Sequence, residues 1–305
     1  MTRVSVLKGG WSAEREVSLR SGAAAAKALV QAGFEVTEIE IARDAAAIVR
    51  QIADSRPDVV FNALHGRYGE DGCIQGLLDI MNLPYTHSGL LASALAMDKA
   101  YARHLFAASG IPVAEGRVAS RAELLAGDPL PRPYVVKPIN EGSSVGVHII
   151  HERSNGLPFT DATWPYGDEV LVERFIPGRE LTVAVMGDRA LGCLEITSDR
   201  GFYDYEAKYA PGGSKHLMPA PVPPHIYEEA CRLSLLAHQA LGCRGVSRAD
   251  LRYDDTEGRE LLYLLEVNTQ PGMTATSLVP EIAAHVGISF PDLVTWMVEN
   301  ATCHA

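Results

Sequence analysis

The 305-residue sequence predicts a mixed fold, in which an N-terminal α/β domain with a parallel sheet precedes an α+β region with antiparallel sheets. Two patterns predict it. Up to about residue 90, short β-prone runs alternate with Ala-rich helical stretches, as in strands joined by crossover helices. Beyond that point, β-branched runs follow one another across short polar turns, as in antiparallel sheets.

In the N-terminal part, glycines and a histidine stand directly after expected strands. Gly9-Gly10 follows the first strand and His65-Gly66 follows the third, at the carboxyl ends where parallel sheets bind ligands. The stretch GGWSAE lacks the GxGxxG spacing, which disfavours a Rossmann dinucleotide site. The expected elements are strands over 4–7, 34–41 and 57–64 and helices over 12–32 and 44–54.

The rest of the chain is dominated by strands joined by short turns. Pro177-Gly178-Arg179 makes a tight turn between two apolar strands, and DDTEGRE at 254–260 makes a polar turn between two others. The expected elements are a helix near 98–109, strands over 134–137, 145–150, 169–176 and 180–187, a helix over 223–242, a hairpin over 251–268, and two closing helices.

Composition argues against several classes of protein. The hydrophobic fraction of 47% and charged fraction of 21% are ordinary for a globular protein, and a net charge of −11 without a dense basic run argues against nucleic-acid binding. The five cysteines are far apart and never spaced as CxxC, which argues against a disulfide framework or a zinc site. The apolar N-terminal run is too short for a signal peptide, and no stretch approaches the roughly 20 apolar residues of a membrane span. We therefore expect a cytoplasmic protein that does not bind membranes.

The last hairpin carries three oxygen-bearing side chains. Glu266 and Asn268 are two residues apart on one expected strand, so both point to the same face, and Asp250 precedes the turn on the partner strand. If the hairpin pairs around DDTEGRE, the three converge as hard ligands suited to Mg²⁺. The alternative is a solvated face of a surface hairpin.

A glycine-serine loop follows a lysine at residues 137–147, KPINEGSSVGV. Such a loop is either a flexible hairpin turn or a phosphate clamp, in which small residues let backbone N–H groups approach an anion. Lys99 and Lys137 could supply cations to nucleotide phosphates. The P-loop pattern GxxxxGK[ST] and the kinase signatures HRD and DFG are absent.

These stretches, taken together and in order, resemble the D-alanine–D-alanine ligases of the ATP-grasp superfamily. The resemblance implies an N-terminal (pre-ATP-grasp) substrate-binding domain over 1–92, a central ATP-grasp subdomain over 93–177 and a C-terminal ATP-grasp subdomain with the metal site over 178–305. The matching stretches are GGWSAEREVSLRSG (9–22), LHGRYGEDG (64–72), MDK (97–99), VVKPINEGSSVGV (135–147), LVERFIPGRELTVAV (171–185), FYDYEAKYAPGG (202–213), GVSRADL (245–251) and LLEVNTQPGMTATSLVP (264–280).

The resemblance implies that ATP lies between the two antiparallel sheets. The loop from Glu141 to Gly146 would close over the phosphates, and Glu180 would hold the ribose hydroxyls. The residues implied to bind ATP are Lys99, Lys137, Glu141, Ser143, Ser144, Glu173, Phe175, Ile176, Glu180 and Lys208.

It also implies a two-step ligation for peptidoglycan precursor synthesis. The carboxylate of the first D-alanine attacks the γ-phosphate to form an acylphosphate, and the amine of the second D-alanine then displaces phosphate. Two Mg²⁺ ions, or Mn²⁺, would be bound by Asp250, Glu266 and Asn268. Arg248 and the backbone N–H of Gly272 would stabilise the oxyanion of the second step.

For the amino-acid substrates, the resemblance points to residues from all three parts of the chain. Glu14 would bind the first ammonium group beside His65, and Glu14, Ser143 and Tyr209 match a hydrogen-bonded trio. Ser277 and Leu278 match positions that receive the second carboxylate. The chain differs from many relatives at Gln270 and from some at Thr276, which leaves the shape of the second-substrate pocket open.

Three further expectations follow from the resemblance. Residues 202–216 would form a lid over ATP, the chain would form a homodimer, and Tyr209 would favour D-alanine over D-lactate as the acceptor. The alternatives are a D-alanine–D-lactate ligase, another ATP-grasp carboxylate–amine ligase, or an ATP-binding module without turnover.

Overall fold

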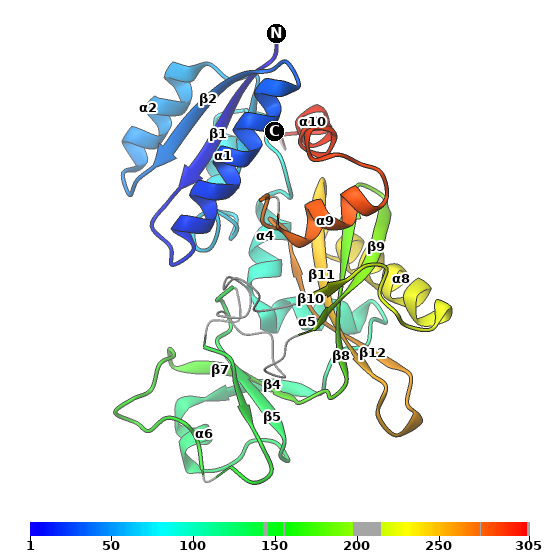
Figure 1. Cartoon of the computed structure of the whole chain (residues 1–305). Coiled ribbons are helices and arrows are strands. Elements are labelled where there is room, and N and C mark those ends of the chain that lie inside the picture. Colours follow the sequence, from blue (N-terminus) through cyan, green and yellow to red (C-terminus); the bar gives the residue numbers. More distant parts are fainter. Residues whose placement is uncertain (143–145, 155, 198–214, 275, 304–305) are drawn as a thin grey trace.

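The fold contains three sheets, and helices pack against them (Figure 1). The computed structural model confirms the predicted combination of an N-terminal parallel sheet with two antiparallel sheets. Within the described residues, no helix combines the length and apolar character that crossing a bilayer requires. The structure describes residues 1–142, 146–154, 156–197, 215–274 and 276–303.

The N-terminal sheet has three parallel strands in the order β2-β1-β3. Helices cover both faces, because the right-handed crossovers from β1 to β2 and from β2 to β3 run in opposite directions across the sheet. The elements are β1 (Arg3–Gly9), α1 (Arg15–Gln31), β2 (Glu35–Ile41), α2 (Ala45–Ser55), β3 (Val59–Asn62) and α3 (Cys73–Ile80).

The central sheet is antiparallel, with the strand order β4-β7-β5-β6. Its short helix begins at a capping box, in which the Ser120 hydroxyl accepts from the Glu123 backbone N–H and the Glu123 carboxylate accepts from the Ser120 N–H. The elements are β4 (Gly116–Ser120), α6 (Arg121–Ala126), β5 (Tyr134–Lys137), β6 (His148–Ile150) and β7 (Glu169–Arg174).

The C-terminal sheet has five antiparallel strands in the order β10-β9-β8-β11-β12. Gly178 makes the turn into β8 at φ 91°, where an added Cβ would lie 2.1 Å from the Tyr253 carbonyl oxygen, so only glycine fits. The elements are α4 (Leu90–Met97), α5 (Lys99–Ala108), β8 (Arg179–Met186), β9 (Arg189–Thr197), β10 (Lys215–Leu217), α8 (Pro224–Ala240), β11 (Val246–Asp254), the 3₁₀ turn Thr256–Gly258, β12 (Leu261–Asn268), α9 (Leu278–His285) and α10 (Phe290–Glu299).

The hydrophobic cores cross the expected domain boundaries. One core joins Val4 and Phe61 of the N-terminal sheet to Met186 and Leu293 of the C-terminal region, and α10 lies beside α1 in Figure 1. The Tyr85 backbone N–H donates to the Thr302 carbonyl, so the last described segment of the chain pairs beside the N-terminal sheet. Helix α5 packs on the C-terminal sheet although residues 93–177 were expected to form the central subdomain. The two boundaries between the three expected parts of the chain stay a prediction.

Two histidines of these cores are buried. His87 is 3% exposed beside the backbone of Gly245, and His238 is 2% exposed on α8, where its Nδ1 pairs with the Ser247 hydroxyl at 2.7 Å. Burial disfavours the charged imidazolium and lowers the pKa of His87 to about 3 and that of His238 to about 4. Both histidines are therefore neutral in the folded protein near pH 7.

We expect the free energy of unfolding to fall when the pH is lowered below about 6.5. In that range the unfolded chain binds a proton at each histidine and the folded chain does not, so each contributes a slope of about 1.4 kcal/mol per pH unit and the pair about 3 kcal/mol down to about pH 5. Urea denaturation across this range measures the slope. His238→Gln should remove about half of it, and the exposed His225→Gln should not change it. An unchanged slope in His238→Gln would contradict the assignment.

Candidate active site

Around the site, the two faces of β11 and β12 differ in polarity. Ala249, Leu251 and Tyr253 of β11 pack into the core on one face, so Arg248, Asp250 and Arg252 point to the other. On β12 the alternation is interrupted by a β-bulge at Leu265: Leu264 pairs with Leu251, whereas Glu266 pairs with Asp250. The extra residue turns Glu266 and Asn268 onto the polar face, although Leu262 and Leu264, an even number of residues before them, face the core.

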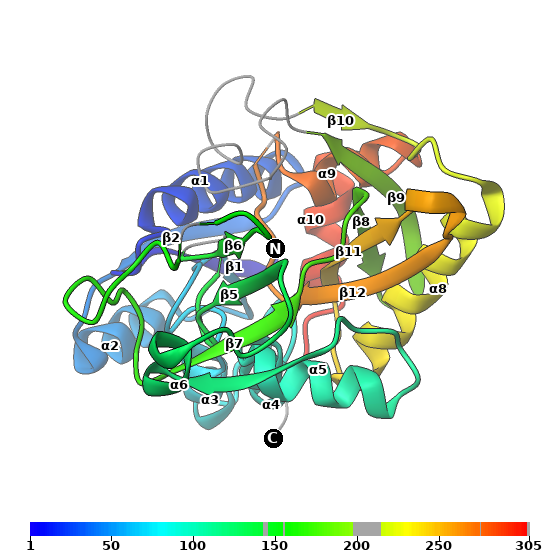
Figure 2. The ribbon, with the colours of Figure 1, turned by 90° about the horizontal axis from the view of Figure 1, so that it is seen from below.

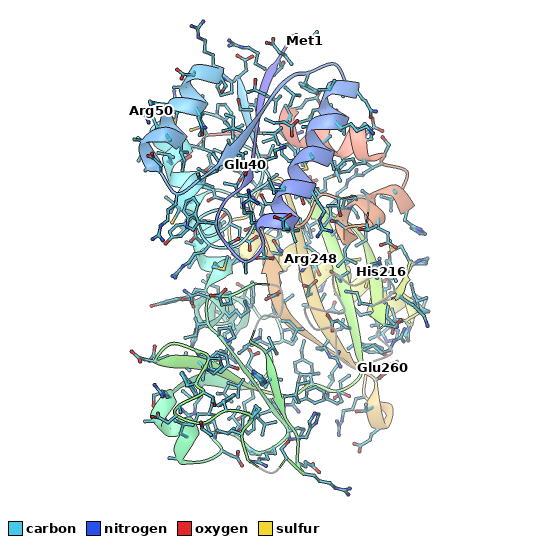
Figure 3. The ribbon with its side chains drawn as sticks, turned by 60° about the vertical axis from the view of Figure 1, so that its left-hand side comes forward. Met1, Glu40, Arg50, His216, Arg248 and Glu260 are labelled. Atoms are coloured by element: carbon cyan, nitrogen blue, oxygen red, sulfur yellow. The ribbon has the colours of Figure 1, made fainter. Side chains whose placement is uncertain are left out.

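Asp250 is held by three hydrogen bonds. Its Oδ1 accepts from the Thr182 hydroxyl at 2.6 Å and from Arg248 Nε at 2.9 Å, and its Oδ2 accepts from Arg248 Nη2 at 2.7 Å. Only 7% of Asp250 is exposed, and the neighbouring cation compensates the removal of the carboxylate from water. Arg248 lies near the middle of the molecule in Figure 3, whereas Glu260 lies at the outer end of the β11–β12 hairpin.

The polar face also offers a set of hard oxygen ligands. Glu266 lies directly opposite Asp250 and pairs with Lys99 at 3.3 Å, and Asn268 accepts from the Gln270 backbone N–H at 2.8 Å. Carboxylate and amide oxygens retain further lone pairs, so two carboxylates and one amide fit a divalent cation. Among the described residues, no three His, Cys, Asp or Glu side chains gather as a metal site.

Two cavities meet at Lys99 and Glu266, which line both. The first, about 190 Å³, lies between the N-terminal domain and the C-terminal sheet. The second, about 110 Å³, lies between the central and C-terminal sheets, whose strands β5, β7, β8, β11 and β12 are seen from below in Figure 2. A group transferred between ligands in the two cavities would therefore pass the Lys99–Glu266 pair.

The second cavity is lined by paired charges and apolar side chains. Lys137 is 7% exposed and lies 2.5 Å from Glu173, whose other oxygen lies 3.4 Å from Arg103 Nε. Glu180 lies 3.7 Å from Arg252. Lys99 Nζ donates to the Glu141 carbonyl at 2.5 Å, which joins α5 to the start of the glycine-serine loop. Phe175 and Ile176 contribute apolar surface.

The first cavity has a carboxylate-rich wall on its N-terminal side. Glu14 is the N-cap of α1, and an added Cβ at Gly142 would lie 3.3 Å from Glu14 Oε2 and 3.4 Å from Glu70 Oε1. His65 is 6% exposed, with Nδ1 3.9 Å from Glu70 Oε2 and Nε2 3.2 Å from the Ser21 hydroxyl. Carboxylates placed in this way suit an ammonium group.

The opposite wall of this cavity is formed by Arg248 and the loop after β12. Ser277 is the N-cap of α9, and its hydroxyl lies 2.9 Å from where a Cβ on Gly272 would stand, so glycine keeps this space open. The backbone N–H groups at the start of α9 favour an anion. Thr276 also lines this cavity.

The structure gathers all the expected site residues that it describes. Ser143, Ser144, Lys208, Tyr209 and most of the expected lid lie outside the described residues; Lys215 and His216, at the end of that lid, belong to β10. The first cavity contains Glu14, His65, Lys99, Arg248, Glu266, Asn268, Gly272, Ser277 and Leu278. The second contains Lys99, Lys137, Glu141, Glu173, Phe175, Ile176, Glu180, Asp250 and Glu266.

Four residues that support the site were not expected from the sequence. Thr182 bonds Asp250, Ser21 and Glu70 lie beside His65, and Arg103 lies beside Glu173. Glu70 also lines the first cavity. Glu70 stands within the matching stretch LHGRYGEDG, so its buried carboxylate was the one with a sequence signal. The others are common residue types without a pattern of their own.

Family models match most of the chain. A model described as the D-alanine–D-alanine ligase C-terminus matches residues 105–299, and one described as the N-terminus matches residues 45–88. The chain belongs to the D-alanine–D-alanine ligase family.

Individual members of the family agree. A D-alanine–D-alanine ligase from Paramagnetospirillum magneticum is 71% identical over 99% of both chains. The crystal structure of the Bacillus anthracis D-alanine–D-alanine ligase complexed with ATP is 28% identical, with a TM-score of 0.84 over 98% of this chain and 97% of that chain. The VanG D-Ala:D-Ser ligase from Enterococcus faecalis is 29% identical, with a TM-score of 0.80 over 98% of both chains.

We expect Thr182→Val to lower the free energy of unfolding of this ligase by about 1–3 kcal/mol, because the buried Asp250 carboxylate loses a hydrogen bond while the volume of the side chain is kept. Urea denaturation measures the change. Thr37→Val, on the exposed part of β2, is the matched control and should change it by less than about 0.5 kcal/mol. Equal losses in the two variants would contradict the role of Thr182.

Proposed function

We propose that this chain joins two D-alanine molecules into D-alanyl-D-alanine, with hydrolysis of ATP to ADP and phosphate, for peptidoglycan precursor synthesis. The observation that supports it most is the meeting of the two cavities at Lys99 and Glu266. The second cavity suits a nucleotide, and the first suits amino acids. Within a family of ATP-dependent ligases, this arrangement places the phosphoryl donor beside the carboxylate that it activates.

ATP occupies the second cavity. Phe175 and Ile176 follow β7 and pack against the adenine, Glu180 accepts from the ribose hydroxyls, and the ammonium groups of Lys99 and Lys137 bind phosphate oxygens. Glu173 and Glu266 orient the two lysines. The lysines therefore need little rearrangement when the nucleotide binds.

Asp250, Glu266 and Asn268 would hold Mg²⁺ or Mn²⁺. A divalent cation bound there would neutralise negative charge on the transferring phosphoryl group. Arg248 donates to the Asp250 carboxylate and supplies a permanent positive charge beside this site. Thr182 fixes the orientation of Asp250.

The two amino acids occupy the first cavity. Glu14, beside Glu70 and His65, binds the ammonium group of the first D-alanine and directs its carboxylate towards Lys99 and the phosphates. Ser277, Leu278 and the start of α9 bind the carboxylate of the second. Arg248 and the Gly272 N–H stabilise the oxyanion that forms when the second amine attacks the acylphosphate.

The proposal also names D-alanine as the acceptor, the second substrate that attacks the acylphosphate. The fold alone does not select it, because a D-Ala:D-Ser ligase has the same fold. The identity of 71% to a D-alanine–D-alanine ligase over nearly the whole chain supports D-alanine. Preference over D-lactate rests on Tyr209, as the sequence predicts. We also propose a cytoplasmic homodimer, by family resemblance.

The proposal is tested by phosphate release from ATP. We expect release that depends on D-alanine and on Mg²⁺ and that neither L-alanine nor D-lactate supports, with D-alanyl-D-alanine as the product. Release without an amino acid, or a different dipeptide as the main product, would contradict the function.

Asp250→Asn and Glu266→Gln should each lower kcat by at least about a hundredfold, because each removes a negative charge that would hold the divalent cation and so weakens stabilisation of the transition state by several kcal/mol. Asp254→Asn is the matched control, because Asp254 is equally buried on β11 but bonds Thr256 and Arg259 at the hairpin turn. Its kcat should stay within about twofold. Near-normal kcat in both site variants would contradict the metal assignment.

A further inference from the structure

Gln270 follows β12, but its side chain does not line the first cavity, although its neighbours do. Thr269 and Pro271 border the first cavity, whereas the Gln270 side chain is 1% exposed and turns towards the N-terminal domain. The Gln270 side chain therefore does not line the second-substrate pocket, because its amide lies at the interface between the N-terminal domain and the C-terminal sheet. A polar side chain that deep needs partners for every donor and acceptor.

The hydrogen-bond partners of Gln270 come from both sides of this interface. Its Oε1 accepts from Asn62 Nδ2 at 2.8 Å, and its Nε2 donates to the Leu64 carbonyl oxygen. Its backbone N–H donates to Asn268 Oδ1 at 2.8 Å. One residue therefore bonds the end of β3 and the end of β12.

The donors and acceptors of this hydrogen-bond network can be arranged in only one way. Asn62 Oδ1 accepts from the Leu64 N–H at 3.1 Å, and Asn62 Nδ2 also donates to the Gly69 carbonyl at 2.9 Å, so the Asn62 amide cannot flip. A reversed Gln270 amide would set two NH₂ groups against each other and two oxygens against each other. Glutamate lacks the donor and methionine lacks both groups, so only glutamine satisfies this position.

The bonded segments carry the site on either side of the first cavity. Leu64 precedes His65 and Gly69 precedes Glu70, whereas Asn268 and Glu266 form the opposite wall. We propose that Gln270 is a positioning residue that sets the separation between the first amino-acid pocket and the phosphate-binding end of β12. This inference rests on the proposed ligase function and adds to it a residue that touches no substrate.

The chemistry makes this separation important. The first step joins a carboxylate oxygen of the amino acid to the γ-phosphorus and breaks the bond to the ADP oxygen, and such a transfer requires reacting atoms about 3–3.5 Å apart. A shift of the His65–Glu70 loop relative to β12 would lengthen that approach while leaving the nucleotide contacts intact. The predicted signature is therefore a change in D-alanine parameters without a change in the KM for ATP.

The test compares Gln270→Met with Gln75→Met. Gln75 is also 1% exposed and donates to the Gly69 carbonyl at 2.9 Å, but it lies on α3 and does not reach the C-terminal loop. Steady-state kinetics give kcat and the KM values, calorimetry with D-alanine in the absence of ATP and divalent cations gives the Kd of the first site, and thermal unfolding gives Tm.

We expect both variants to lower Tm. Gln270→Met should raise the KM and Kd for the first D-alanine and lower kcat by about tenfold each, with the KM for ATP within about twofold of wild type. Gln75→Met should leave these parameters unchanged. In an Asn62→Ala background, Gln270→Met should have a clearly smaller further effect, because both residues belong to one network.

Similar D-alanine parameters in the two variants, at similar losses of Tm, would overturn the proposal and leave Gln270 as a packing residue. If Gln270→Met does not fold, Gln270→Ser, which leaves room for water, gives the same comparison. A wild-type protein without D-alanine-dependent phosphate release would refute the ligase function, and the calorimetric comparison would still decide whether Gln270 orders the amino-acid pocket.

Discussion

The separation of the two faces of β11 and β12 is the constraint on which the site depends. One face must exclude water, since Leu251, Leu264 and Val267 pack against α5 and α8. The other face must present carboxylates to ligands. A regular β12 could not do both, because Leu262, Leu264, Glu266 and Asn268 would share one face. The bulge at Leu265 resolves the conflict by shifting the alternation by one residue between the core and the site.

Charge pairing is the second organising feature, and it follows from that geometry. Carboxylates that leave water need cations, and each of Glu173, Asp250 and Glu266 has one within 3.3 Å. These pairs hold side chains close to where a nucleotide would need them. A ligand that enters exchanges partners within an already ordered set, so less ordering entropy is lost on binding.

The parts of the fold and site that the sequence predicts are those encoded by local patterns. Period-two alternation and turn residues revealed the hairpin that brings Asp250 opposite Glu266, and family motifs named the other cavity residues. The bulge at Leu265 had no signal, because a run of leucines fits either register. Helices α3, α4 and α6 and strands β4, β9 and β10 were missed because they are short or follow no strong period. The partners of Gln270 had no sequence signal, since a side chain's direction in a loop depends on the domain packed against it.

The pairing of Thr302 beside Tyr85 has a consequence for how the molecule is made. Residues 4–63 share one core with residues near 186 and 293, so these residues leave the ribosome before the apolar surface that completes their core. Contacts between such distant positions form late, because the loop between them must close first. The N-terminal sheet would thus wait, with part of its α1 side uncovered, until α10 is synthesised.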